Sequence, residues 1–527
     1  MDPFDYLRGE LALGRTTRRE FVGRASAAGL TLAATTRLAG EARAAEAPRR
    51  GGLLRIGMAG GSSGDSLDPR TYNDSVSINQ GFQVFNALTE LDVQGRIKPE
   101  LAESWQPADD LKQWTFTLRE GVTFHNGKTL DAEDVVYSLN LHRGESKSGG
   151  RSLLADVTGV SAEDKRRVRI ELSGASADLP YVLSDFHFLI VPAGFTDFAK
   201  PVGTGPYRMT EYQPGVRSLA ERNPNYWKQD RAHVDAVELT VINDATARLN
   251  ALVSGRIHVM NRVDRKTAAL LARRQGLSLA RASGGLHYCL LAAADREPTR
   301  SKDVRLALKY ALDREQMLKT LLQGYGTIGN DHPIAAHDPF FDASLAQRAY
   351  DPDKARFHLK QAGLDRLPIT LHTSEAAFPE AVDAAVLFRE TAARAGIDVE
   401  VKREPADGYY NTVWMNVPFC VSYWVNRPTA DMMFSSAYKS DAAWNDAMWR
   451  QPEFDRLLLE ARGTLDEPRR KELYGAMQRM VHEDGGSLIP AFPDWIDAKR
   501  EEVQGFEATP VMELGAQRLA ERVWLSA

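Results

Sequence analysis

The sequence predicts a mixed α/β protein built in more than one lobe. Its 527 residues exceed the roughly 250–300 at which one hydrophobic core stops growing, so at least two domains are expected. Apolar residues make up 43% and charged residues 26%, which is typical of a soluble globular chain and excludes a disordered, collagen-like or multi-span membrane protein. Strand-like and helix-like segments alternate in the second half, the order expected of an α/β domain.

Charge and cysteine content narrow the class further. Lys and Arg total 66 and Asp and Glu total 71, a formal net charge of −5 without a basic stripe, so no nucleic-acid partner is expected. Cys289 and Cys420 are too few for a disulfide scaffold, and whether they are free or bonded stays open.

The N-terminus has the pattern of an export signal. Arg18-Arg19, followed by apolar residues, resembles the twin-arginine signal of bacteria. The uncharged run 25–36 is shorter than the about 20 residues that cross a bilayer, but it suits a signal-peptide core. We therefore expect residues 1–44 to be a signal peptide cleaved near Ala44, with a basic helix retained in the mature protein as the alternative.

In the first half of the mature chain, apolar spacing predicts a strand at 53–58 that ends in a Gly/Ser loop. The segment 114–119 alternates apolar and polar side chains, as a half-buried strand does, and turn signals follow it. Asp131 is placed to cap a helix that runs through Leu139.

In the second half, helical spacing predicts one helix from Asp303 to Gly324. A strand at 367–372, a helix at 379–395 and a strand at 397–401 form a β-α-β unit, whose strands should pair in parallel. A further amphipathic helix is expected at 466–484.

Catalytic and cofactor motifs are weak. Gly60 to Gly64 reads G-x-S-x-G with Ser62 at its centre, but turn-forming residues follow where a nucleophile elbow needs a helix. No H-E-x-x-H occurs, and His332 and His337 lie in a Pro-containing loop. Gly203 to Tyr207 is glycine-rich but lacks the lysine of a P-loop. No catalytic residue, metal or cofactor is predicted.

One segment stands out by its aromatic content. Between Tyr409 and Trp449 lie four of the nine tryptophans, interleaved with polar residues. Aromatic walls with a few directed polar groups are typical of a small-molecule pocket, and an aromatic-rich core explains the segment equally well.

Several motifs together resemble family 5 of the bacterial extracellular solute-binding proteins, the peptide/nickel/opine-type binding components of ABC importers. They occur in the family's order over nearly all of the mature chain: Leu101 to Trp105, Trp114 to Gly127, Asp131 to Val136, Gly203 to Tyr207, Arg222 to Trp227 and Val304 to Leu308. The resemblance implies the two-lobed α/β periplasmic binding protein fold (type II, large cluster C form), with an extra domain on the first lobe. The expected ranges are 48–83, 191–283 and 486–527 for the first lobe, 84–190 for the extra domain and 284–485 for the second lobe.

The resemblance also directs attention to Arg427. Peptide binders of this family carry an acidic residue three places after a second-lobe tryptophan, and it pairs with the amino group of the peptide. Here Trp424 resembles that tryptophan and Arg427 stands at the acidic position, so an anionic ligand group is expected instead. The alternatives are that Arg427 pairs with Asp431, or that it points to solvent or to the other lobe; Asp431 could also supply the acid itself. The candidate ligand-binding residues are Asn73, Tyr288, Tyr423, Trp424, Asn426, Arg427, Asp431, Trp444 and Asn445.

The function that the resemblance implies is transport without catalysis. A monomeric periplasmic protein would capture a small polar solute, such as a short or modified peptide or an opine-like conjugate, and deliver it to the permease subunits of an inner-membrane ABC transporter. The alternatives are a secreted serine hydrolase that uses Ser62 and a ligand-sensing protein that docks on a membrane receptor.

Overall fold

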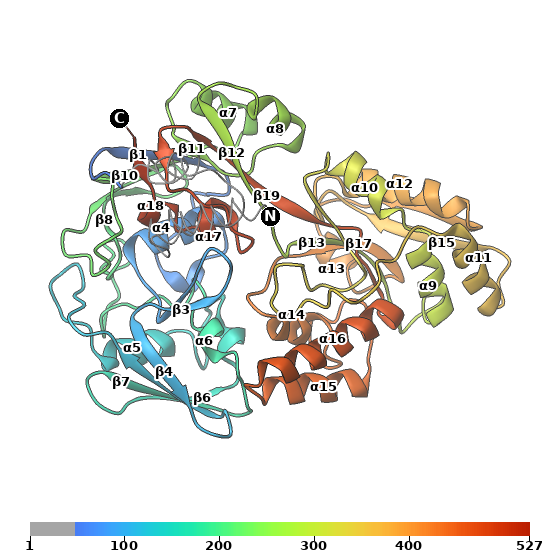
Figure 1. Ribbon diagram of the computed structural model, residues 1–527, viewed down its shortest axis with the longest axis horizontal. Helices are drawn as coiled ribbons and strands as arrows, with labels where there is room; N and C mark the ends of the chain where they lie inside the picture. The colour runs from blue at the N-terminus through green and yellow to red at the C-terminus, as the bar shows by residue number, and fades with distance from the viewer. Residues whose placement is uncertain (1–47, 527) are drawn as a thin grey trace, which may run out of the picture.

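The computed structural model describes residues 48–526, and the expected signal peptide at 1–44 lies outside them. Two lobes stand side by side, and each is built around its own sheet (Figure 1). A smaller antiparallel sheet belongs to the first lobe and forms the extra domain. No helix within residues 48–526 is long and apolar enough to cross a membrane.

The first-lobe sheet has the strand order β12-β19-β11-β1-β10-β9-β8, and β14 pairs with β19. Strand β1 pairs in parallel with β10 and β11, and the other pairings are antiparallel. The strands are β1 (Leu53–Met58), β8 (Tyr207–Gln213), β9 (Arg217–Arg222), β10 (Ala236–Val241), β11 (Val259–Met260), β12 (Leu277–Ser283), β14 (Gly326–Ile328) and β19 (Ala491–Arg500). Helices α4 (Ser75–Val84), α7 (Ala245–Val253), α8 (Arg265–Leu271), α17 (Glu513–Ala516) and α18 (Leu519–Arg522) pack around this sheet, as does the β20–β21 ribbon (Val503–Gln504 and Trp524–Leu525).

The extra domain is a four-stranded antiparallel sheet in the order β4-β5-β7-β6. Its elements are β4 (Ala102–Pro107), β5 (Gln113–Leu118), β6 (Val157–Ala162), β7 (Arg167–Leu172), α5 (Ala132–Asn140) and α6 (Leu179–Val182), with the β2–β3 hairpin (Thr89–Leu91, Ile97–Pro99) beside them. The predicted cap is present. The side chain of Asp131 accepts from the backbone N–H of Asp134, and the side chain of Asp134 accepts from the backbone N–H of Asp131. This capping box starts α5. Trp114 and Phe116 point from β5 into the core, as the alternation predicted.

The second-lobe sheet has the order β16-β15-β17-β13-β18. Its strands are β13 (His287–Ala292), β15 (Leu367–Thr373), β16 (Ile397–Arg403), β17 (Phe419–Trp424) and β18 (Ser487–Leu488). Helices α9 (Lys302–Tyr310), α10 (Arg314–Leu321), α11 (Pro352–Gln361), α12 (Ala381–Ala393), α13 (Tyr409–Thr412), α14 (Ala430–Ala437), α15 (Pro452–Arg462) and α16 (Glu467–Asp484) complete the lobe. Strands β15 and β16 pair in parallel, which confirms the predicted β-α-β unit. Because β18 pairs with β13, Ser487–Leu488 belong to this sheet, although the expected boundary at 486 placed them in the first lobe.

The single helix expected from Asp303 to Gly324 was wrong. The chain forms two helices, α9 and α10, with a break at residues 311–313. Asp313 adopts an extended conformation, and its side chain accepts a hydrogen bond from the backbone N–H of Gln316 at 2.9 Å. A capping aspartate starts a new helix, because it satisfies a free backbone donor of the first turn. The apolar periodicity continued across this break and concealed it.

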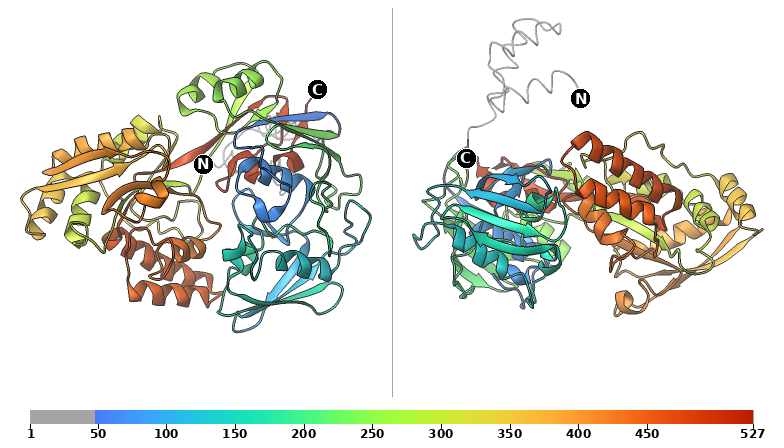
Figure 2. Two further views of the ribbon diagram at one scale, coloured as in Figure 1. Left: turned by 180° about the vertical axis from the view of Figure 1, so that it is seen from behind. Right: turned by 90° about the horizontal axis from the view of Figure 1, so that it is seen from below.

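Two segments join the lobes. The chain passes from β12 to β13 through residues 284–286, and it returns from β18 to β19 through residues 489–490. Strand β19 spans the junction: residues 494–500 pair with β12 of the first lobe. Its first residues, 491–493, pair with β14, a short strand that follows α10 of the second lobe in the chain and lies at the end of the first-lobe sheet. On the side opposite these crossings, α15 lies beside the extra domain in both Figure 1 and Figure 2. The lobes therefore meet at two separated places.

Candidate ligand-binding site

The loop at 425–429 lies next to the first crossing between the lobes. It leaves β17 after Trp424, which is paired with His287 of β13, and it ends where Thr429 caps α14. A methyl group added to Gly285 would lie 2.0 Å from Oδ1 of Asn426, so the loop in this side-chain arrangement packs directly against the crossing. The fold thus places the polar residues of this loop beside the first crossing between the lobes.

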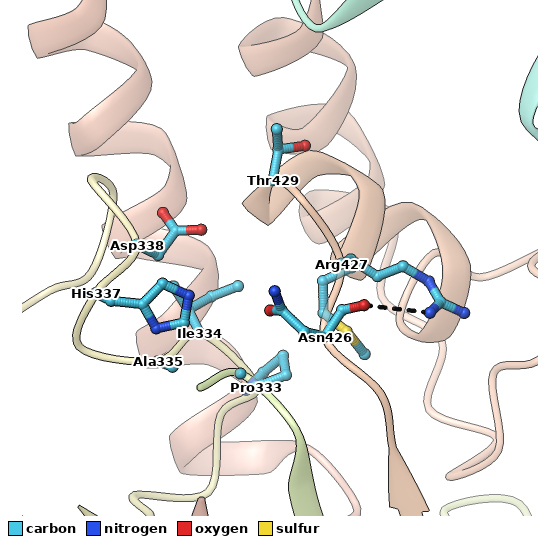
Figure 3. Close-up of a pocket in the computed structure, with 10 residues that line it drawn as sticks. Pro333, Ile334, Ala335, His337, Asp338, Asn426, Arg427 and Thr429 are labelled. Atoms are coloured by element: carbon cyan, nitrogen blue, oxygen red, sulfur yellow. Dashed lines mark hydrogen bonds between the residues drawn. The ribbon is translucent and has the colours of Figure 1, made fainter. Parts of the chain in front are cut away.

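Asn426 forms one wall of a small recess in the second lobe. Its side-chain amide points into the recess, toward Asp338 and His337 on the opposite wall (Figure 3). The residues that line the recess come from the crossing, the 333–338 loop and the start of α14: Gly285, Pro333, Ile334, Ala335, His337, Asp338, Asn426, Arg427, Thr429 and Met433.

Arg427 is a half-buried cation without an ion-pair partner. Its guanidinium points away from the recess, and Nη1 makes a long bond of 3.4 Å to the Asn426 carbonyl (Figure 3). Among residues 48–526, no carboxylate oxygen lies within 4 Å of it. Burial lowers the pKa of Arg427, and the negative charge of Asp185 in the first lobe partly opposes that shift. A desolvated guanidinium in this state would gain from an anionic partner.

Asp338 is the matching half-buried anion. One carboxylate oxygen accepts from the backbone N–H of Phe340 at 2.8 Å, and no cation of the described chain lies within 4 Å. Burial raises the pKa of Asp338 to about 7, with Asp178 of the extra domain adding to the rise. A cationic group bound in the recess would offset the free-energy cost of keeping this carboxylate charged away from water.

Trp424 is held in place by Asp446. The indole Nε1 of Trp424 donates to Oδ2 of Asp446 at 2.9 Å, and Trp414 donates to the same oxygen at 3.2 Å. The guanidinium carbon of Arg427 lies 5.6 Å from the ring centre of Trp424, within cation–π range. The half-exposed Trp444 lies 6.1 Å from Trp424, centre to centre. The structure therefore brings Trp424, Asn426, Arg427 and Trp444 together.

Asp431 does not pair with Arg427, so that alternative for the arginine is wrong. Oδ2 of Asp431 lies 3.4 Å from Nε of Arg462, and Asp431 is 5% exposed. Helix α14 turns the side chain of Asp431 toward α15 and the extra domain, so it is engaged elsewhere.

The remaining candidates lie apart from the recess or have other partners. Asn445 is buried, and its amide bonds the Trp449 carbonyl at 2.6 Å and the Trp449 N–H at 3.1 Å. Tyr288 stacks on Phe378 at 3.7 Å and donates its hydroxyl to Glu380 at 3.1 Å. Tyr423 is 37% exposed, edge-on to Tyr410. Asn73 is exposed in the first lobe, just before α4.

The aromatic block divides between core and surface. Buried members belong to the hydrophobic core of the second lobe: Tyr409, Phe419, Trp424, Phe434, Tyr438 and Trp449. The more exposed members are Tyr410, Tyr423 and Trp444. The block is mainly core, with a small aromatic surface beside the 425–429 loop.

Ser62 has no helix behind it. Its hydroxyl donates to Asp65 at 2.8 Å, in a loop of turns and bends that follows β1. A nucleophile elbow requires a strand-to-helix turn, so the geometry does not support the hydrolase alternative. The two cysteines are buried and free.

Sequence reasoning missed Asp338 and Gly285. Asp338 lies far from Asn426 along the chain, in a loop noted only for its proline and histidines, and no local pattern marks it. Gly285 belongs to the Ser283-Gly284-Gly285 stretch, where a glycine pair between two predicted strands is the signal that could have marked the crossing.

Two α/β lobes, two crossing segments and a polar recess beside one crossing define a two-lobed periplasmic binding protein. The model of the family "Bacterial extracellular solute-binding proteins, family 5 Middle" matches residues 96–446, which is 351 of 527 residues. The chain belongs to this family of solute-binding proteins, whose members serve transport and are not enzymes.

Individual relatives are distant but match over most of their length. The dipeptide-binding protein of Escherichia coli is 24% identical over 500 residues, covering 85% of this chain and 91% of the relative. The structure of HbpA2 from Haemophilus parasuis superposes with a TM-score of 0.80 at 20% identity, over 90% of this chain and 100% of that one. The structure of AgaA from A. tumefaciens R10 with agropinic acid gives a TM-score of 0.74 at 23% identity, over 90% and 99%.

Proposed function

We propose that the protein captures a small polar solute between its lobes and delivers it to the permease of an inner-membrane ABC importer. The observation that carries the finer part of the proposal is the unpaired, half-buried guanidinium of Arg427, next to the aromatic face of Trp424. A guanidinium in a site that excludes water requires an anion, and the solute itself can supply a carboxylate or phosphate.

The solute also carries a cationic group under this proposal. Asp338 and the amide of Asn426 face one another across a recess small enough for an ammonium group and little else. Opposite charges on either side of the 425–429 loop suit a zwitterion. A short or modified peptide and an opine-like conjugate both have this chemistry, in agreement with the dipeptide and agropinic acid in the names of the relatives.

Mass spectrometry of the molecules that co-purify with the protein tests the solute class. Calorimetric titration with neutral and anionic versions of that molecule tests Arg427. We expect Arg427→Ala to weaken binding of the anionic form about 30-fold or more, since loss of a buried charge partner costs roughly 2–5 kcal/mol. Arg427→Lys should restore part of the affinity, because lysine lacks the planar fork.

Arg389→Ala, an exposed arginine on α12, is the matched control and should bind like the unaltered protein. Equal affinity for the neutral and anionic forms, with Arg427→Ala binding normally, would eliminate anion recognition by Arg427.

Export by the twin-arginine route is part of the proposal, and it rests on Arg18-Arg19 and the uncharged run after them. Replacement of both arginines by lysine should leave the precursor in the cytoplasm, as measured by fractionation and immunoblotting. Normal periplasmic accumulation of that variant would contradict the route. We further propose that the mature protein is a monomer that catalyses no reaction, to be checked by analytical ultracentrifugation and by the Ser62 variant discussed below.

A further inference from the structure

The second lobe touches the extra domain on the side away from the crossings. The backbone N–H of Ala177, just before α6, donates to the carbonyl of Arg462 at the end of α15 at 3.0 Å. A Cβ atom built on Gly463 would lie 3.8 Å from the Cβ of Ala175. Backbones from the two lobes are thus in direct contact, although no covalent crossing lies nearby.

Two ion pairs cross this contact. Nη2 of Arg470 on α16 lies 2.6 Å from Oδ1 of Asp178, with both side chains 10% exposed or less. Nη2 of Arg462 lies 3.1 Å from Oδ2 of Asp156, a more exposed carboxylate. The first pair is enclosed and the second lies at the rim, so the Arg470–Asp178 pair contributes more, since solvent screens exposed pairs.

The carboxylates in this contact outnumber the guanidinium groups. Asp431 approaches Arg462 from within the second lobe at 3.4 Å, so three carboxylates share two arginines. Two buried oxygens, Oδ2 of Asp178 and Oδ1 of Asp431, have no hydrogen-bond partner. The half-buried Asp338 also acts on Asp178 and Arg470, and the Tyr474 hydroxyl lies 3.4 Å from Arg470.

Separation of the lobes would change this balance. Asp156 and Asp178 would leave with the extra domain and regain water, while Asp431 and Arg462 would stay together in the second lobe. Arg470 would lose the Asp178 carboxylate and keep its contacts with the Tyr474 hydroxyl and the ring of Phe340, while Asp338 and Asp431 of its own lobe act on it from farther away. This pairing of charges therefore requires the lobes to be in contact as they are in this structure.

We propose that this contact is an ionic latch that stabilises the closed arrangement of the lobes, with Arg470–Asp178 as its main pair. The latch lies outside the recess and sets how long the lobes stay closed, whichever solute they hold. It extends beyond the proposed function, because it requires neither a particular ligand nor a role for Arg427. In a closed contact, loss of Arg470 leaves Asp178 buried without its cation, so the closed population falls.

A disulfide trap across the contact tests the latch in the mature protein without added ligand. Cβ atoms about 3.5–4.5 Å apart suit a disulfide, so the pair Ala175→Cys and Gly463→Cys should cross-link under mild oxidation whenever the lobes close. The native Cys289 and Cys420 lie in adjacent strands of one lobe and cannot join the lobes. Peptide mass spectrometry identifies the cross-link.

In this background, Arg470→Met should slow cross-linking about tenfold or more, because it removes the charge and keeps the apolar stem. Arg469→Met is the matched control: Arg469 is exposed and pairs with Glu460 and Glu472 of its own lobe, so the rate should not change. Asp178→Asn removes the partner instead and should also slow the reaction. If circular dichroism shows that Arg470→Met does not fold, the cross-linking rate of Asp178→Asn is compared with the control instead.

Equal cross-linking rates in the Arg470→Met, Asp178→Asn and Arg469→Met backgrounds would overturn the latch. Failure of the cysteine pair to cross-link in the otherwise unaltered chain would overturn it as well, because the closed contact would then not form.

Discussion

The carboxylate of Asp431 lies 3.4 Å from Nε of Arg462 and is held away from Arg427. The sequence left open that Arg427 and Asp431 form an ion pair, and the structure shows that they do not. Arg427 has no carboxylate oxygen within 4 Å among residues 48–526, which supports the proposal that the solute supplies one. Asp431 belongs instead to the contact between the lobes. Asp431 is buried and its Oδ1 has no hydrogen-bond partner, so burial raises the pKa of this carboxylate and we expect it to respond to pH.

The first prediction concerns pH. Burial raises the pKa of Asp431 to about 7, against the opposing effect of Arg462, whereas an unfolded aspartate titrates near 3.9. The folded protein therefore binds this proton more tightly, and its free energy of unfolding should rise as the pH falls from 8 toward 5. Asp431→Asn should flatten that dependence in thermal melts across this range.

Asp338 and Asp446 also have pKa values raised to about 7, so the Asp431 variant should reduce the pH dependence without abolishing it. Asp441→Asn, a change at an exposed aspartate, is the control and should leave the slope unaltered. An unchanged slope in Asp431→Asn would show that this carboxylate does not titrate in the range.

Local patterns in the sequence were sufficient for elements that depend on nearby residues. The strand at 53–58 has the predicted bounds, since its apolar run ends at a glycine loop. The 303–324 segment failed because one capping side chain, Asp313, outweighed an unbroken periodicity. For the site, the resemblance to the solute-binding family was enough to mark Arg427 as a candidate ligand-binding residue. Asp338 could not be found, because only the tertiary fold brings its loop opposite Asn426.

The second prediction concerns Ser62. Its hydroxyl bonds Asp65 in an exposed loop, and no helix follows to form an elbow. Ser62→Ala should change the free energy of unfolding by no more than about 0.5–1 kcal/mol and leave solute affinity unaltered. A serine-reactive fluorophosphonate should label neither form. Esterase activity that disappears in Ser62→Ala would contradict the assignment to a binding protein without catalysis.

The third prediction concerns the second crossing between the lobes. Asp331 is fully buried between Arg314 at 2.5 Å and Arg348 at 2.9 Å, and it accepts from the backbone N–H of Ile489 in the crossing at 3.1 Å. The surrounding cations hold the pKa of Asp331 well below its usual range. Its contribution to stability is therefore present above about pH 4 and is lost only in stronger acid.

Asp331→Asn should lower the free energy of unfolding by about 3–5 kcal/mol at neutral pH, because two buried guanidinium groups lose their anion. Urea denaturation measures the change. Asp353→Asn, at an aspartate whose side chain is 85% exposed, should cost less than about 1 kcal/mol. Similar costs for the two variants would show that the buried cluster does not anchor the crossing.

The fourth prediction contrasts the two glycines of the first crossing. A methyl group on Gly284 would meet the backbone carbonyl of Pro510 at 2.7 Å and the indole of Trp495 at 2.6 Å, so Gly284→Ala should destabilise the fold. A methyl group on Gly285 meets only side-chain atoms of Asn426, the nearest at 2.0 Å. Asn426 can rotate away, and Gly285→Ala should therefore change the free energy of unfolding by about 1 kcal/mol or less.

Rotation of Asn426 would alter the recess, so Gly285→Ala should weaken solute binding about tenfold, the loss expected for one good hydrogen bond of about 1.4 kcal/mol. Isothermal titration with the co-purified solute measures the affinity, and thermal melts measure the stability. The double variant Gly285→Ala, Asn426→Ala removes the collision and should melt like the unaltered protein while still binding weakly. Full affinity in Gly285→Ala would mean that the amide of Asn426 does not contact the solute, because its displacement is the only change that the substitution forces in the recess.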